Sequence, residues 1–88
     1  MKKIERDGYF IYYRDENGNE LRALEETGRL LGATFDGAEY GNVQQTPLPN
    51  PTYKWQRIGK GRMGKAFLDW REQAEKEIKA ALEKPISK

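Results

Sequence analysis

The chain is short, highly charged and free of both cysteine and histidine. Its 88 residues fit a single domain, and 34% of them are charged, with a net charge of +2. The missing residue types remove disulfides, thiol nucleophiles, the commonest general base and the commonest metal ligands. No complete catalytic motif is present either. We therefore expect a non-enzymatic, cytoplasmic protein that binds no cofactor or metal and, lacking any run of about 18 apolar residues, no membrane.

Charge is unevenly distributed along the sequence. Residues 1–46 carry a net charge of −3, and residues 72–88 are balanced. Residues 47–71 hold six basic side chains against a single acidic one, Asp69. Because the basicity is local, we interpret it as a property of one surface and not of the whole molecule.

Residues 1–35 have the pattern of a β-hairpin followed by a further strand. Residues 9–14 are aromatic and β-branched, which favours a strand, and Asn17-Gly18 is a strong turn signal. Residues 21–24 can return as the second strand. A three-residue loop with Gly18 in the left-handed conformation would place Arg14 opposite Glu20, which pairs unlike charges.

A helix is the rival interpretation of the second strand. Asn19 could cap a helix that runs to Leu31 and ends at Gly32. Thr27-Gly28 would interrupt that helix, so we prefer the hairpin. Residues 29–35 then form a possible third strand, closed by a turn at Asp36-Gly37.

The second half begins with a predicted loop and ends with a predicted helix. Residues 36–52 are rich in glycine and proline, which indicates a loop, and residues 53–58 alternate well enough for a short strand. We predict the C-terminal helix over residues 62–84, with Pro85 preventing its continuation. Its apolar stripe, at spacings of three and four, consists of Met63, Ala66, Phe67, Trp70, Ala74, Ile78, Ala81 and Leu82.

These elements predict an α+β domain that spans residues 1–88. We expect a small antiparallel sheet of two to four strands, made of the N-terminal hairpin and one or two further strands. The C-terminal amphipathic helix should pack across one face of the sheet.

Residues 59–66 match two nucleotide-binding motifs in part. Gly59, Gly61 and Gly64 satisfy G-x-G-x-x-G, and Gly59, Gly64 and Lys65 satisfy most of the phosphate-binding loop. The latter motif needs a serine or threonine where this chain has Ala66. Both folds also need further parallel strands, and the 22 residues after Ala66 leave no room for them. We therefore exclude both motifs.

The local chemistry of this basic segment, residues 53–65, still favours an anionic partner. Basic side chains can neutralise phosphates, and aromatic rings among them can stack on unpaired bases. We expect the segment to contact a polyanion, most plausibly nucleic acid. The candidate residues are Tyr53, Lys54, Trp55, Arg57, Lys60, Arg62 and Lys65.

A protein partner is the alternative. Compact, cysteine-free, highly charged chains of this size are typical of small accessory or inhibitor proteins, such as those encoded by phages and other mobile elements. Such a protein would use the basic segment, or an aromatic patch on the hairpin formed by Tyr9, Tyr12 and Tyr13, to bind a larger protein. The sequence does not determine the oligomeric state.

Overall fold

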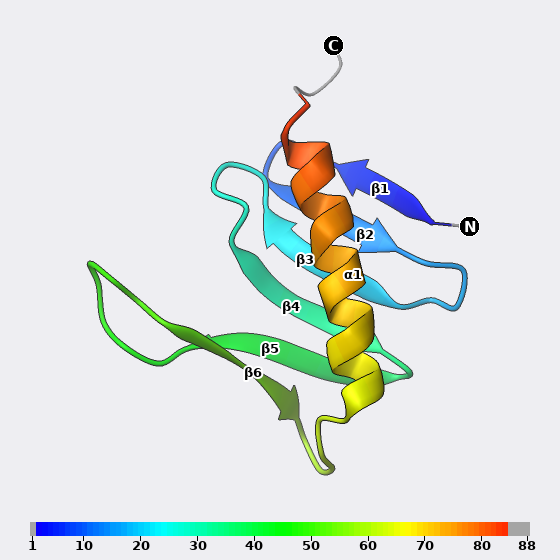
Figure 1. Cartoon of the computed structure of the whole chain (residues 1–88), viewed down its shortest axis with the longest axis vertical. Coiled ribbons are helices and arrows are strands. Elements are labelled where there is room, and N and C mark those ends of the chain that lie inside the picture. The colour runs from blue at the N-terminus through cyan, green and yellow to red at the C-terminus, as the bar shows by residue number, and fades with distance from the viewer. Residues whose placement is uncertain (1, 85–88) are drawn as a thin grey trace.

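The computed structural model describes residues 2–84, which form an antiparallel sheet crossed on one face by a helix (Figure 1). The strands follow one another in a simple meander, β1-β2-β3-β4-β5-β6. The helix, α1, leaves the β6 end of the sheet and ends near β1 (Figure 1). The elements are β1 (Lys3–Arg6), β2 (Phe10–Arg14), β3 (Glu20–Leu24), β4 (Leu30–Phe35), β5 (Ala38–Gln44), β6 (Tyr53–Ile58) and α1 (Lys65–Leu82).

The prediction of a small sheet with two to four strands is wrong, because residues 2–84 contain six strands. Two of them gave no clear pattern in the sequence. β1 is four residues long and carries three charges, and β5 contains glycine and several polar residues. β5 is nevertheless a strand because β4 and β6 pair with it on both sides. Of the predicted 36–52 loop, only the turn at 36–37 and the loop at 45–52 therefore remain.

The hairpin at β2 and β3 is confirmed, together with its register. Arg14 lies opposite Glu20, and the Arg14 Nε donates a 2.6 Å hydrogen bond to Glu20 Oε2. Gly18 has a φ of +81°, which is the left-handed conformation that the turn requires. The rival helix from Asn19 to Leu31 is wrong, because residues 20–24 and 30–35 are strands.

The core lies between the sheet and α1. Alternate side chains of the central strands point toward the helix, as expected for a sheet with one covered face. Phe67 is at the centre of an aromatic cluster at one end, where its ring stacks on Tyr40 with centroids 3.8 Å apart. The buried apolar residues are Ile11, Tyr13, Leu21, Ala23, Ala33, Tyr40, Phe67, Ala74 and Ile78.

The C-terminal helix is shorter than predicted. It begins at Lys65 and not at residue 62, because residues 59–64 form the connection that turns the chain from β6 into the helix. Phe67, Ala74 and Ile78 are its buried residues, whereas Ala66 is exposed. Pro85 lies outside the described residues. Within residues 2–84, α1 is too polar to cross a membrane, and no other helix is present.

Arg6 ties the first strand to the far end of the helix. Its guanidinium pairs with the Glu25 carboxylate through Nε and Nη2. Its Nη1 donates 3.0 Å hydrogen bonds to the backbone carbonyls of Ala81 and Lys84. The Ala81 carbonyl lies in the last turn of α1 and the Lys84 carbonyl just after the helix, so one side chain ties β1 to the C-terminal end of α1.

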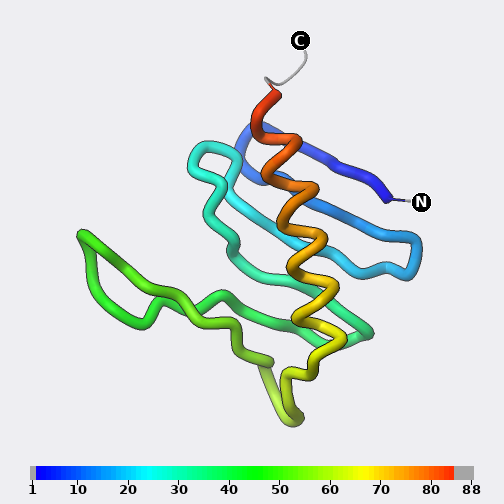
Figure 2. Tube along the Cα trace, in the orientation of Figure 1, coloured from blue at the N-terminus to red at the C-terminus, as the bar shows by residue number. Residues whose placement is uncertain are grey.

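A hairpin arm extends beyond the sheet. β4 stops pairing with β5 at Gly41, but β5 and β6 continue to pair with each other from Asn42 opposite Trp55 to Gln44 opposite Tyr53. Residues 42–55, named the β5–β6 arm below, therefore project as a two-stranded ribbon that is plain in the chain trace (Figure 2). Its base is held by a 3.0 Å hydrogen bond from Asn42 Nδ2 to the Leu30 carbonyl.

Candidate nucleic-acid interface

One end of the molecule is built mainly from a stretch of the chain that has no acidic residue. No aspartate or glutamate occurs between Glu39 and Asp69, and residues 40–68 carry five basic side chains. They form most of β5, the β5–β6 arm, β6, the connection at 59–64 and the first turn of α1. These elements lie together at one end of the fold (Figure 1). With +5 at this end and −3 on the rest of the chain, the protein has a cationic pole.

β6 divides the predicted site residues between two faces of the sheet. Residues alternate along a strand, so Tyr53, Trp55 and Arg57 share the helix side and Lys54 shares the opposite side with Gln56 and Ile58. The seven candidate residues therefore do not form one continuous surface. What they share is their place at this end of the molecule.

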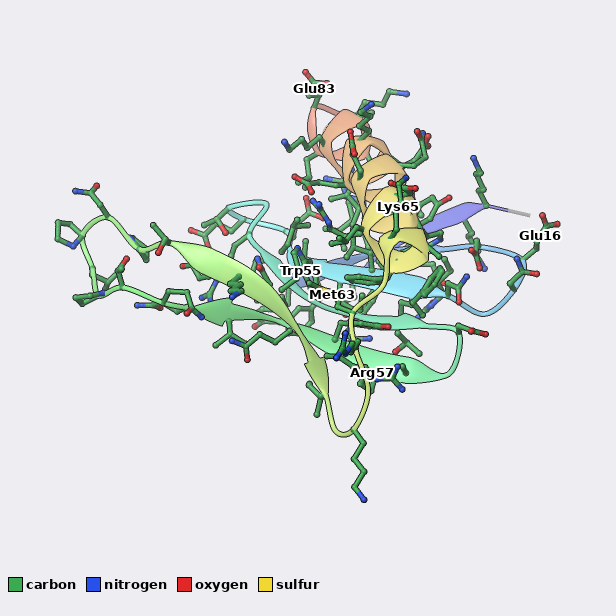
Figure 3. The ribbon with its side chains drawn as sticks, turned by 60° about the horizontal axis from the view of Figure 1, so that its bottom comes forward. Glu16, Trp55, Arg57, Met63, Lys65 and Glu83 are labelled. Atoms are coloured by element: carbon green, nitrogen blue, oxygen red, sulfur yellow. The ribbon has the colours of Figure 1, made fainter. Side chains whose placement is uncertain are left out.

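The aromatic side chains of the basic segment are engaged within the protein. The Trp55 ring is half-buried and meets Phe67 edge to face, with centroids 5.5 Å apart. Trp55 and Met63, both labelled in Figure 3, each pack against the core. The Arg29 guanidinium lies over the Tyr53 ring at 4.6 Å. In this structure neither ring is an open stacking platform, contrary to the expectation from the sequence.

The basic side chains differ in their availability. Lys65 forms a 2.6 Å ion pair with Asp69, and the hydrogen bond to that carboxylate raises the pKa of Lys65. Within residues 2–84, no ion pair engages Lys60 or Arg62, which are exposed in the connection between β6 and α1. Lys60 and Arg62 are therefore accessible to an external anion.

Arg57 packs against the same connection. Gly61 has a φ of +117°, a backbone conformation that favours glycine, and the Arg57 guanidinium lies beside it. Arg57 also lines an open pocket of about 170 Å³ beside Gly64, Ala66 and Phe67. The guanidinium therefore lies near the start of α1.

The start of α1 is compatible with an anion. Gly64 is the N-cap and provides no side-chain cap, and the first turn holds no acidic residue. The free backbone N–H groups and the helix dipole favour negative charge at this point. Asp36 lines the same pocket and opposes an anion there. We therefore assign the cationic character to the exposed connection and not to the pocket.

The fold gives neither nucleotide motif its required context. Within the described chain β6 pairs only with β5, in antiparallel orientation, and no strand follows α1. Gly59 and Gly61 have positive φ values, so they serve the turn between β6 and α1.

The three tyrosines of the predicted aromatic patch are separated. Tyr9 is 79% exposed in the turn before β2, whereas Tyr13 is 3% exposed and packs against Trp70. Tyr12 lies on the open face of the sheet, where the Arg14 guanidinium sits 4.9 Å from its ring centroid. Tyr13 is part of the core and is therefore not available to a partner. Phe10, 37% exposed and next to Tyr12, is the more accessible aromatic side chain of this strand.

The open face of the sheet is a ladder of paired charges. Arg14 binds Glu5 and Glu20, and Arg22 binds Glu20 and Glu39. Since these charges neutralise one another, the face offers no net attraction to a polyanion.

The acidic turn between β2 and β3 has a structural role. The Asp15 carboxylate accepts 2.9 Å hydrogen bonds from the backbone N–H groups of Asn17 and Asn19, from Asn19 Nδ2 and from Trp70 Nε1. Among the described residues, no three carboxylates are grouped so that they could hold a metal ion.

Sequence reasoning missed two parts of this end of the molecule, the β5–β6 arm and Arg29. Both could have been flagged by the acid-free run itself, because that run starts at residue 40, well before the basic segment. Searches of the chain against protein-family models and curated proteins, and of its structure against solved structures, give no match.

Proposed function

We propose that this protein is a non-enzymatic nucleic-acid-binding protein whose cationic pole contacts the phosphate backbone. The observation that carries the proposal is the gathering of the acid-free residues 40–68 at one end of the fold, with Lys60 and Arg62 exposed and outside any ion pair in residues 2–84. A surface with this charge and without an internal counter-ion attracts a polyanion and releases its counterions.

The anchoring cations are Lys54, Arg57, Lys60 and Arg62. Lys60 and Arg62 flank Gly61 in the connection between β6 and α1, and both side chains are exposed there. Lys65 contributes less, because Asp69 already neutralises it.

The first test is a salt series with DNA and RNA. With four phosphate contacts, affinity for duplex DNA should fall roughly 100-fold between about 50 and 200 mM salt. Replacing Lys60 and Arg62 together with alanine should reduce the slope of log affinity against log salt by about 2, with weaker binding to all sequences. Fluorescence anisotropy with labelled oligonucleotides measures both quantities.

The matched control removes the same charge elsewhere. Lys76 and Lys84 are exposed near the other end of α1. The double variant Lys76→Ala, Lys84→Ala therefore has the same net charge as the test variant but keeps the cationic pole. It should bind as the parent does. If the two double variants bind equally well, net charge and not this surface governs binding, and the proposal is wrong.

A protein partner remains the second candidate, and the exposed Tyr9 and Phe10 favour it. They lie side by side in sequence, at 79% and 37% exposure. A purification that returns one stoichiometric protein after nuclease treatment, and loses it on replacing Tyr9 and Phe10 with serine, would support this function.

A further inference from the structure

The β5–β6 arm differs in chemistry from the cationic surface at its base. Residues 41–53 contain no charged side chain, although charged residues make up 34% of the chain. Lys54 lies at the base of the arm, and Arg29 covers Tyr53 there. Positive charge therefore lies at the base of the arm, and the projecting part (Figure 2) is neutral and rich in amides, threonine and proline.

An aliphatic side chain lies exposed at the tip of the arm. Leu48 is 75% exposed and stands between Pro47 and Pro49. Contact with water is unfavourable for a large apolar side chain at the end of a projection. Burial of Leu48 in a partner would therefore stabilise the complex.

Hydrogen bonds within the tip fix its shape. The Gln45 N–H donates to the Thr52 carbonyl at 2.7 Å, and the Thr52 N–H donates to Thr46 Oγ1 at 2.8 Å. Gln44 Nε2 donates to the Thr46 carbonyl at 2.8 Å. The prolines restrict the backbone further. The tip is thus organised before any partner binds, which lowers the entropy cost of binding.

From these features we infer that the partner is duplex DNA and that the β5–β6 arm enters its minor groove, with Leu48 and its flanking prolines acting as a wedge between base pairs. This inference rests on the proposed function, because the cationic pole must hold the duplex against the protein while the arm enters the groove. Apolar wedges of leucine or proline unstack a base step from the minor groove and kink the duplex.

The apolar tip of the arm favours the minor groove, since leucine and proline wedges act from that side of the duplex. Bidentate contacts to guanine in the major groove rely on arginine or lysine, and the tip of the arm has neither. The minor groove, about 6 Å wide, is too narrow for a two-stranded ribbon unless the duplex is deformed. Unstacking of a base step by Leu48 would widen the groove, so the arm can enter the groove only if Leu48 acts as a wedge.

The test measures bending separately from binding. A short duplex labelled at its two ends should show increased energy transfer when the parent protein binds, because the ends approach each other. Leu48→Ser should lose that increase and keep the parent's salt dependence, since no phosphate contact is removed. Tyr9→Ser removes a side chain of similar exposure in the turn before β2 and should bend DNA as the parent does.

The outcomes separate the inference from the proposed function. If the parent binds no duplex at low salt, the proposed function itself fails. If the parent binds through Lys60 and Arg62 but leaves the duplex straight, or if Leu48→Ser still bends it, the inference that Leu48 is a wedge is wrong. The arm would then be a surface for a protein partner. Since Leu48 is exposed, circular dichroism of Leu48→Ser should match the parent, which excludes misfolding as the cause of a lost bend.

Discussion

Replacing Phe67 with alanine is expected to lower the free energy of unfolding by about 3–5 kcal/mol, the largest effect of any single substitution in this chain. Phe67 is 1% exposed and stacks on Tyr40, and its ring also meets Phe35, Trp55 and Trp70. Truncation would leave a cavity bounded by four rings that are held by different elements and cannot all close on it. Urea denaturation followed by tryptophan fluorescence measures the loss.

Leu68 supplies the control for this prediction. It is the next residue on α1 but only half-buried, so Leu68→Ala should cost clearly less than Phe67→Ala. Equal losses for both variants would mean that the aromatic cluster around Phe67 contributes no more to stability than the half-buried contacts of Leu68. In a small domain with a total stability of about 5–15 kcal/mol, Phe67→Ala would leave a large unfolded fraction at moderate temperature.

The second prediction concerns Asp15, which joins the β2–β3 turn to the helix. Asp15→Ala removes the acceptor of four hydrogen bonds, including the one from Trp70 Nε1, and should destabilise the fold by about 1.5–3 kcal/mol. Trp70→Phe removes a single donor and retains most of the ring, so its loss should be smaller. Chemical denaturation of both variants at neutral pH compares them.

The same carboxylate predicts a dependence on pH. Burial alone would raise the pKa of Asp15, but the hydrogen bonds from Asn19, Asn17 and Trp70 outweigh burial and hold this pKa below its ordinary value. Because the folded-state pKa is lowered, the stabilisation is complete above the unfolded-state pKa of about 3.9 and is lost as the pH falls below it. The stability difference between the parent and Asp15→Asn should therefore shrink on acidification below about pH 4. A difference that stays constant down to pH 2 would contradict this assignment.

Local signals in the sequence were sufficient for the hairpin and the helix. Asn17-Gly18 defines a turn whose neighbours can pair in few ways, and the Arg14–Glu20 pair selects one register. Likewise the spacing of Phe67, Ala74 and Ile78 defines the buried stripe of α1 without knowledge of what covers it. Both signals come from residues that are close together in the chain, so they can be recognised without the tertiary structure.

Strands β1 and β5 lack such signals, because each becomes a strand through its neighbours. The residues of β5 include Gly41 and Asn42, which favour turns in isolation, but hydrogen bonds from β4 and β6 on either side outweigh that preference. The missing strands also explain the missing arm, since a projecting ribbon exists only if β5 and β6 pair beyond the edge of β4.

The sequence by itself determined the hairpin, the amphipathic helix and the local excess of positive charge between residues 40 and 68, since each is a property of neighbouring residues. Only the tertiary structure decided which charges are free. Packing against α1 draws Trp55 inward, Asp69 pairs with Lys65 one helical turn away, and Lys60 and Arg62 stay exposed in the connection between β6 and α1. Exposure and pairing depend on what the rest of the chain places beside each residue, and that is settled by packing across the whole fold.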